Sequence, residues 1–185
     1  VLQLLSVVVV GIAVALMLIS PELVLIFGSP KYREAVYVIP PVAASVFFIF
    51  IYNILSMPQF YYEKTQFLMA ASMAAAGANV VLNFIFIRLF GYIAAGYTTL
   101  ACYMLYSVGH YIVSKRILVN EGIQENLMNP GFLLACSVFL IGASIICNLI
   151  FPYRILRYAI LLASAGLVFW KKELLLKTMA DIRKK

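Results

Sequence analysis

The feature that most constrains this chain is a set of long stretches without a charged residue. Five of them contain no Asp, Glu, Lys or Arg, at 1–21, 35–62, 65–87, 89–114 and 126–153. A helix needs about 20 mainly apolar residues to cross the hydrocarbon core of a bilayer, which is about 30 Å thick, because each residue adds about 1.5 Å. Each of these stretches is therefore long enough to form a transmembrane helix.

A sixth apolar stretch, 158–170, is shorter but also fits a transmembrane helix. Arg157 and Lys171 flank it, and long basic side chains can extend along the hydrocarbon core to place their charges among the headgroups. The sequence therefore predicts an all-α integral membrane protein, a bundle of six transmembrane helices. The approximate spans are 1–20, 36–57, 66–88, 92–113, 131–151 and 156–170, and a basic amphipathic cytoplasmic tail follows at 171–185.

The overall composition supports a chain surrounded by lipid. Hydrophobic residues make up 65% of it and charged residues 11%, with a mean hydropathy of +1.03, whereas a soluble domain is about 45–50% apolar. The net charge of +7 comes from basic residues that flank the apolar stretches, which favours anionic membrane lipids and not nucleic acid as the partner. The chain begins inside a hydrophobic run without Met, so we expect upstream helices to be missing from it.

The positions of the basic residues predict the orientation of the spans. Nine Lys and Arg residues fall on the side of the two chain ends, six of them in the tail, and five fall on the opposite side. Cytoplasmic loops carry the excess of Lys and Arg, so we expect a cytoplasmic C-terminus. Without the tail the count is three against five, so the tail decides this prediction. We expect the tail to lie as a helix on the membrane, with an unstructured basic end as the alternative.

Serine and proline pairs mark the boundary between the first two spans. Ser20 and Pro21 are expected to open a short separate helix that Gly28 closes, so that the first span ends in a bend. Ser29 and Pro30 repeat the signal and are expected to start the second long helix.

Further prolines predict a kink and another helix start. Pro40 and Pro41 fall inside the predicted second helix, where two missing N–H donors should kink it. Such a kink is common both in transporters and in membrane proteins that transport nothing. Asn129 with Pro130 predicts the start of the fifth span.

No set of residues for catalysis or metal binding is apparent. None of the seven acids lies deep in a predicted span, so there is no carboxylate pair for acid–base chemistry and no acidic metal motif. Cys102, Cys136 and Cys147 lack a Cys-x-x-Cys spacing and are expected to be small buried hydrophobes. His110, the only histidine, is expected to contact headgroups, with a proton relay as the alternative. We predict no catalytic residue, no metal, no cofactor and no enzymatic activity.

Three amides are the polar groups that lie deepest in the predicted spans. Asn53 lies in the second span, and Asn79 and Asn83 share one face of the third because they are four residues apart. Amides that face lipid are costly, so this face should point at other helices or at a watery cavity. Arg88 ends the third span. Its side chain either extends to the headgroups or contacts an anionic substrate, and the sequence is compatible with both.

Two groups of residues carry a resemblance to a known family. The first group is Ser20-Pro21-Glu22, Ile26-Phe27-Gly28 and Tyr32-Arg33-Glu34-Ala35. The second group is Asn79-Val80-Val81-Leu82-Asn83 and Phe90-Gly91-Tyr92-Ile93-Ala94-Ala95. The region from 20 to about 100 resembles the C-terminal half of the polysaccharide flippases, the O-antigen and capsule-repeat exporters of the multidrug/oligosaccharidyl-lipid/polysaccharide transporter superfamily. Arg88 departs from the family pattern, which commonly has Pro there. Beyond residue 112 the similarity is to the hydropathy pattern alone.

The resemblance implies a transporter of two six-helix bundles, of which this chain is the second and the missing N-terminal half is the first. It implies that a polyprenyl-diphosphate-linked oligosaccharide moves from the inner to the outer leaflet of the bacterial cytoplasmic membrane by alternating access, for polysaccharide biosynthesis. The implied partners are this lipid-linked substrate and membrane lipids. The candidate residues of the substrate path are Asn53, Asn79 and Asn83 in the cavity and Lys31, Arg33 and Arg88 as outer-mouth cations for the diphosphate.

Other functions remain open from the sequence. A multidrug or metabolite exporter of the same superfamily would share the bundle, and acids within the spans would favour it. A membrane glycosyltransferase or polysaccharide polymerase would need a substantial extramembrane loop, whereas the longest linker here, 115–130, is short. A purely structural membrane subunit is the remaining alternative.

Overall fold

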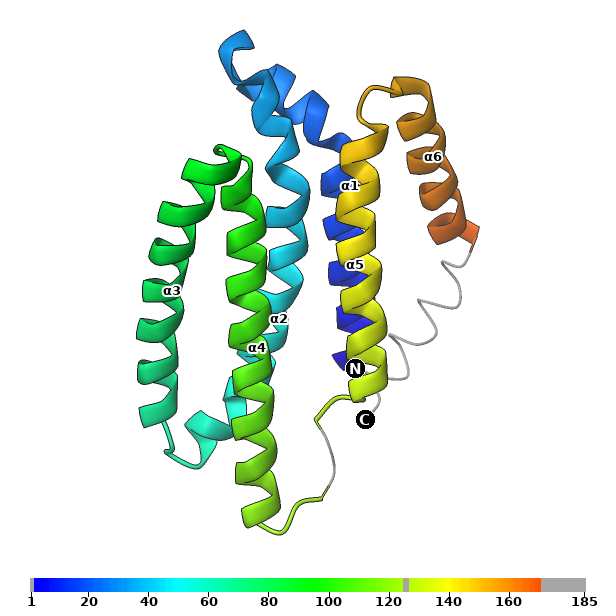
Figure 1. Ribbon diagram of the computed structural model, residues 1–185. Helices are drawn as coiled ribbons and strands as arrows, with labels where there is room; N and C mark the ends of the chain where they lie inside the picture. The colour runs from blue at the N-terminus through cyan, green and yellow to red at the C-terminus, as the bar shows by residue number, and fades with distance from the viewer. Residues whose placement is uncertain (1, 125–126, 171–185) are drawn as a thin grey trace.

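The computed structural model describes residues 2–124 and 127–170, and the predicted tail at 171–185 lies outside them. Within these residues all regular structure is helical, which confirms the all-α prediction. The elements are α1 (Leu2–Phe27), η1 (Pro30–Tyr37, a 3-10 helix), α2 (Ile39–Tyr61), α3 (Gln66–Phe90), α4 (Ala94–Asn120), α5 (Pro130–Ile150) and α6 (Arg154–Trp170). Successive α-helices run in opposite directions along one bundle (Figure 1).

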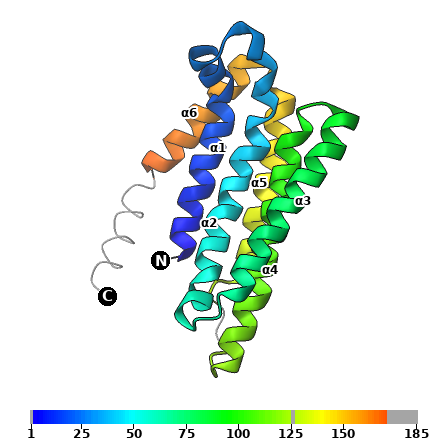
Figure 2. The ribbon, with the colours of Figure 1, turned by 90° about the vertical axis from the view of Figure 1, so that its left-hand side faces the viewer.

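Helix α2 lies at the centre of the bundle. It packs against α1, α4 and α5, whereas α3 packs against α4 at one edge and α6 packs against α1 and α5 at the other (Figures 1 and 2). Much of the buried core comes from α2, namely Ala43, Ala44, Phe47, Phe48, Ile51, Ile54 and Leu55. The structure describes all of α3, and none of its residues is buried. Most of the α3 surface is therefore left to lipid or to another protein chain.

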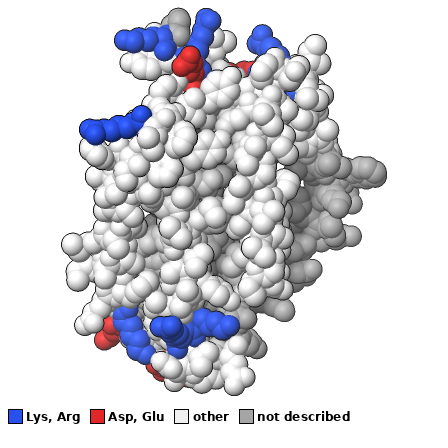
Figure 3. All heavy atoms as spheres, in the orientation of Figure 1, with Lys and Arg blue, Asp and Glu red and all other residues white. Residues whose placement is uncertain are grey.

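Four of the helices, α1, α2, α3 and α5, are long and apolar enough to cross a membrane. The sequence also predicts α4 and α6 as spans, which this finding does not include. Helix α6 has only 17 residues, and the many Tyr, Thr and Ser residues of α4 lower its hydropathy. Figure 3 shows the charged side chains of one face gathered at the two ends of the bundle, with an uncharged belt between them. Hydrocarbon requires such a belt, because charges in the bilayer core are costly.

The basic residues divide between the two ends of the bundle. One end holds η1, the last turn of α3 and the start of α6, and the other holds the α2–α3 turn and the last turns of α4. Of the basic residues that the structure describes, those of the first end, the η1 end, are Lys31, Arg33, Arg88, Arg154 and Arg157, and those of the opposite end are Lys64, Lys115 and Arg116. Which end faces the cytoplasm stays a prediction.

Helix α1 is continuous through Pro21, so the prediction of a short separate helix is wrong. Proline has no N–H to donate to the carbonyl four residues earlier, which here is that of Met17. The hydroxyl of the buried Ser20 donates to this oxygen at 2.8 Å, so the carbonyl keeps a partner.

The helix ends just before Gly28, as expected. A Cβ at Gly28 would lie 2.5 Å from a backbone oxygen of the preceding turn, so only glycine fits there.

The other helix starts follow the proline and cap signals in part. Ser29 precedes the 3-10 helix η1, and α2 begins only at Ile39. Pro40 and Pro41 therefore occupy the first turn of α2, where backbone N–H groups have no partner within the helix. The predicted kink at these prolines is wrong for this reason. The predicted start of α5 is confirmed, because the Asn129 side chain accepts hydrogen bonds from two backbone N–H groups of the first turn, at 2.9 and 3.4 Å.

A buried ion pair joins α6 to α1. The guanidinium of Arg157, whose side chain is 4% exposed, donates to both carboxylate oxygens of Glu22, at 2.9 and 3.0 Å. The same guanidinium donates to the carbonyl of Leu18 at 3.0 Å, and the Tyr158 hydroxyl donates to Glu22 at 2.8 Å. The predicted extension of Arg157 to the headgroups is wrong, because Glu22 gives this cation a partner inside the bundle.

Candidate functional site

A polar cleft opens between α2, α3 and α4. Its volume is about 350 Å³, and its lining residues are Tyr52, Ser72, Ala75, Ala76, Asn79, Thr99, Cys102, Tyr103 and Tyr106. The two alanines of α3 make room for the cleft because their side chains end at Cβ. All of these lining residues are uncharged, and hydroxyl groups and one amide supply most of the polar atoms. The polar cleft can therefore hydrogen-bond a neutral polar ligand without placing a charge in the bilayer core.

Three tyrosines from α2 and α4 form one wall of the polar cleft. The rings of Tyr52 and Tyr103 are nearly parallel with centroids 6.3 Å apart, and Tyr106 meets Tyr52 edge-on at 4.7 Å. The Tyr106 hydroxyl lies 2.6 Å from the Ser72 hydroxyl on α3. A tyrosine offers both an apolar ring and a polar tip. This wall therefore suits a ligand whose surface combines C–H and hydroxyl groups.

Two of the three predicted amides belong to a hydrogen-bond chain between α3 and α4. Asn83 Nδ2 donates to Asn79 Oδ1 at 2.9 Å, and Thr98 Oγ1 donates to Asn83 Oδ1 at 2.6 Å. Asn83 thus bonds one helix to the next, whereas Asn79 also lines the polar cleft. Sequence reasoning misses Thr98, because a threonine near a helix start carries no signal until the facing helix is known.

Asn53 lies outside the polar cleft. Its side chain is exposed on α2 and donates to the carbonyl of Ile49, one turn back in the same helix, at 2.8 Å. The structure therefore brings Asn79 and Asn83 together but does not add Asn53 to them.

The three predicted cations lie at the η1 end of the bundle. Lys31, Arg33 and Arg88 are exposed, and the Arg88 guanidinium lies over an aromatic ring of α3, 3.8 Å from its centroid. At the same end the Tyr92 hydroxyl donates to Glu34 at 3.0 Å, which links η1 to the α3–α4 turn. Among the described residues neither Lys31 nor Arg33 forms an ion pair. Both are therefore free to contact an anion.

His110 is buried, so the predicted headgroup contact is wrong. Both His110 and Gln59 on α2 are 0% exposed, and Gln59 Nε2 lies 2.8 Å from His110 Nδ1. Gln59 Oε1 and His110 Nε2 have no hydrogen-bond partner within the part of the chain that the structure describes. Sequence reasoning misses Gln59, because a single glutamine near a helix end does not indicate which residue faces it.

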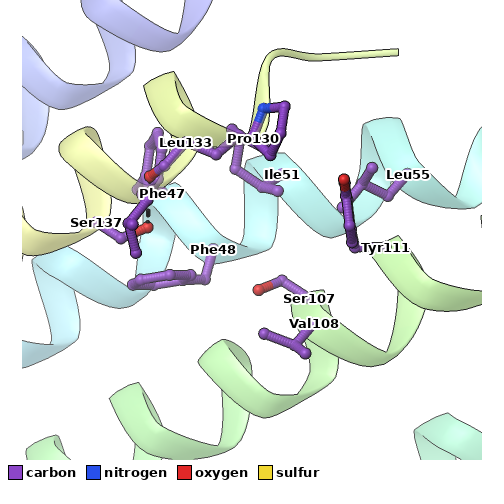
Figure 4. A pocket seen from close by; sticks show the side chains of 11 residues that line it. Phe47, Phe48, Ile51, Leu55, Ser107, Val108, Tyr111, Pro130, Leu133 and Ser137 are labelled. Atoms are coloured by element: carbon purple, nitrogen blue, oxygen red, sulfur yellow. Dashed lines mark hydrogen bonds between the residues drawn. The ribbon is translucent and has the colours of Figure 1, made fainter. Parts of the chain in front are cut away.

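An apolar crevice lies between α2, α4 and α5. Its volume is about 210 Å³, and Figure 4 shows Phe47 and Ile51 of α2 and Leu133 of α5 around it. The hydroxyls of Ser107 and Ser137, which also line it, donate to carbonyls of their own helices at 2.9 and 2.8 Å. The apolar crevice therefore presents hydrocarbon surface, which suits an apolar chain.

Comparison of the chain with protein-family models, with curated proteins and with solved structures produced no match. Within residues 2–124 and 127–170, no group of three His, Cys, Asp or Glu side chains is placed to hold a metal ion. Cys102, Cys136 and Cys147 are free thiols, and Cys102 and Cys147 are buried. The polar cleft and the apolar crevice, together with the sequence motifs, are therefore the features of this chain that bear on its function.

Proposed function

We propose that this chain is one bundle of a membrane transporter that moves a lipid-linked oligosaccharide from the inner to the outer leaflet. The observation that carries the proposal is the polar cleft, a space lined by hydroxyls and an amide on a bundle of mainly apolar helices. A sugar that crosses about 30 Å of hydrocarbon needs hydrogen-bond partners on its way. The polar cleft supplies neutral partners, and such a step requires no catalytic residue.

Two further surfaces match the other parts of a lipid-linked substrate. The exposed Lys31, Arg33 and Arg88 at the η1 end suit its diphosphate, because Lys and Arg are the usual phosphate-binding side chains. The apolar crevice suits its hydrocarbon chain. In this proposal the η1 end faces outward from a bacterial cytoplasmic membrane, and the opposite end, with Lys115 and Arg116, faces the cytoplasm.

The lining of the polar cleft favours this function over the alternatives. An exporter of amphipathic cations would need an acid in its path, and the lining residues include none. A glycosyltransferase or polymerase would need catalytic acids or bases placed around a sugar. In our proposal a second bundle covers part of α3, which has no buried residue within this chain.

The test is leaflet transfer of a fluorescent polyprenyl-diphosphate oligosaccharide by the full-length protein in liposomes. We expect Asn79→Leu to slow transfer roughly tenfold, the effect of losing about 1.4 kcal/mol of hydrogen bonding to the moving sugar. Asn120→Leu makes the same change at the exposed end of α4 and should transfer at the wild-type rate. Asn53→Leu tests the separate prediction for Asn53 in the same assay. Wild-type transfer by the Asn79→Leu, Asn83→Leu double variant would remove the polar cleft from the substrate path.

A further inference from the structure

We propose that the buried pair of His110 and Gln59 is a proton-binding site that adjoins the polar cleft, with the proton as the coupling ion of transport. The coupling rests on the proposed function, whereas the proton site does not. The pair joins the second half of α4 to the last turns of α2, near the end of the bundle that carries Lys64. Both residues are fully buried, so no headgroup or bulk water contacts them.

The hydrogen bonds of Gln59 determine the tautomer of His110. Gln59 Nε2 donates to the carbonyl of Leu55 at 3.4 Å and faces His110 Nδ1 at 2.8 Å. An amide nitrogen carries two hydrogens and accepts none, so His110 Nδ1 is the acceptor and the neutral ring carries its hydrogen on Nε2. Gln59 Oε1 is then left as a buried acceptor without a partner among the described residues.

A second proton on the His110 ring needs a hydrogen-bond acceptor, and Gln59 Oε1 can be that acceptor. When an opening of the bundle lets a hydronium ion reach the pair, Nδ1 takes its proton through the lone pair and a water molecule leaves. Nδ1 then becomes a donor and repels the amide N–H in front of it. A half-turn of the Gln59 amide exchanges its nitrogen for Oε1, which accepts from the new Nδ1–H. The pair therefore has a hydrogen-bonded arrangement for each protonation state. No covalent bond besides the new Nδ1–H forms or breaks in this step, and the half-turn gives up the hydrogen bond of Gln59 Nε2 to the carbonyl of Leu55.

Three aromatic rings from three helices surround the imidazole. Their centroids lie 4.5 Å away for Tyr106 on α4, 5.4 Å for Phe67 on α3 and 5.8 Å for Tyr52 on α2. An aromatic ring attracts a cation that lies over its face within about 6 Å of its centroid. All three ring centroids lie within that distance of the imidazole.

No acid faces the pair within the described part of the chain. The titratable side chains whose rings pack against His110 are Tyr52 and Tyr106, and α3 contributes Phe67. Within residues 2–124 and 127–170, the charged residues at this end of the bundle are the exposed Glu63, Lys64, Lys115, Arg116 and Glu121, and none of them hydrogen-bonds to His110 or Gln59. A proton at His110 therefore changes the net charge of the site by one.

The proton site and the polar cleft share two residues. Tyr52 and Tyr106 line the cleft and also contact the His110 ring, and the Tyr106 hydroxyl pairs with that of Ser72 across the cleft. A charge on His110 acts directly on these two tyrosines. This shared wall is the physical route by which a bound proton would alter binding in the polar cleft.

The single histidine of the chain makes the proton site directly measurable. With 15N-histidine in the full chain in lipid nanodiscs, we expect the Nδ1 resonance to move from an unprotonated to a protonated position as the pH is lowered in steps from 8. We expect Gln59→Leu to lower the midpoint by about one pH unit, a tenfold loss of proton affinity, and Gln59→Glu to raise it. The exposed Gln66 at the start of α3 provides the matched control, since Gln66→Leu should leave the midpoint unchanged.

A wild-type Nδ1 resonance that stays at its unprotonated position down to the lowest pH at which the protein remains folded would overturn the proton site, and this measurement needs no variant to fold. An unchanged midpoint in folded Gln59→Leu would overturn the role of Gln59. The coupling is tested by leaflet transfer in liposomes with an imposed pH gradient, which should speed wild-type transfer and leave His110→Gln unaffected. A titrating His110 without any transfer would reject the proposed function alone, and transfer that ignores the gradient in the wild type would reject the coupling alone.

Discussion

Ser20 is the residue that allows α1 to pass through Pro21. Its hydroxyl donates to the carbonyl of Met17, which proline leaves without its usual N–H partner. Ser6 lies in the same helix, is equally buried and donates to the carbonyl of Leu2 at 2.9 Å. The backbone N–H of Ser6 itself can also donate to the carbonyl of Leu2, as in any regular helix turn. The two serine hydroxyls therefore make the same kind of hydrogen bond, but only that of Ser20 replaces a missing backbone donor.

We expect Ser20→Ala to lower the free energy of unfolding by about 1–3 kcal/mol, because it leaves a buried carbonyl without a donor. Ser6→Ala, the matched control, should lower it by about 0.5 kcal/mol or less. Denaturant unfolding in detergent micelles, followed by circular dichroism, measures both. Equal losses for the two variants would show that the hydroxyl of Ser20 does not replace the donor that proline lacks.

The ion pair of Arg157 and Glu22 makes a second prediction for single residues. Glu22→Gln leaves a guanidinium that is 4% exposed without its counter-charge, and removing one partner of a buried pair costs about 3–5 kcal/mol. Glu34→Gln makes the same change at an exposed position and should cost about 1 kcal/mol or less. Thermal unfolding in detergent compares the two, and similar midpoints would contradict the importance of the buried pair.

At the scale of the elements, the contact between α2 and α4 organises the bundle. The helices approach closely where Gly96 in the first turn of α4 meets the start of α2. A Cβ on Gly96 would lie 2.8 Å from Pro41 Cγ and 2.9 Å from the carbonyl oxygen of Val38. The prolines that begin α2 thus shape the surface on which α4 packs.

We expect Gly96→Ala to destabilise the protein by about 1–3 kcal/mol, because the added methyl forces the two helices apart. Gly77 in α3 has no atom within 4 Å of an added Cβ, so Gly77→Ala should be neutral or stabilising by up to about 1 kcal/mol through helix propensity. Thermal unfolding of both variants in the same detergent measures the difference. Loss of stability in Gly77→Ala without loss in Gly96→Ala would contradict this packing.

At the scale of the whole molecule, the charged residues predict two faces of the membrane. We expect Arg33→Cys at the η1 end and Lys64→Cys at the opposite end to react with a membrane-impermeant maleimide from opposite sides, in a background in which the three native cysteines are Ala. Arg33→Cys should react in intact cells and Lys64→Cys only after permeabilisation. Both positions are exposed, so access to the reagent depends on the side alone. Labelling of both in intact cells would contradict the six-span topology.

Hydropathy predicted where the helices lie better than it predicted which side chains of neighbouring helices face each other. The charge-free stretches indicated helices at the places where α2, α3 and α5 lie, because helix formation in lipid depends on local apolar length. Helix α4 carries Tyr103, Tyr106 and His110, which lower its hydropathy and face α2 or the polar cleft. The pattern of Asn79 and Asn83 indicated a polar face, but Thr98 and Gln59 could not be recognised until the facing helices were known.

The helical fold, the places of α3 and α5 and the separation of the described charges between two ends follow from local sequence, because each depends on residues close together in the chain. Which polar groups meet depends on the packed bundle: Arg157 with Glu22, Thr98 with Asn83 and His110 with Gln59. These partners come from different helices, and the faces that two helices turn to each other depend on how side chains pack across the whole bundle.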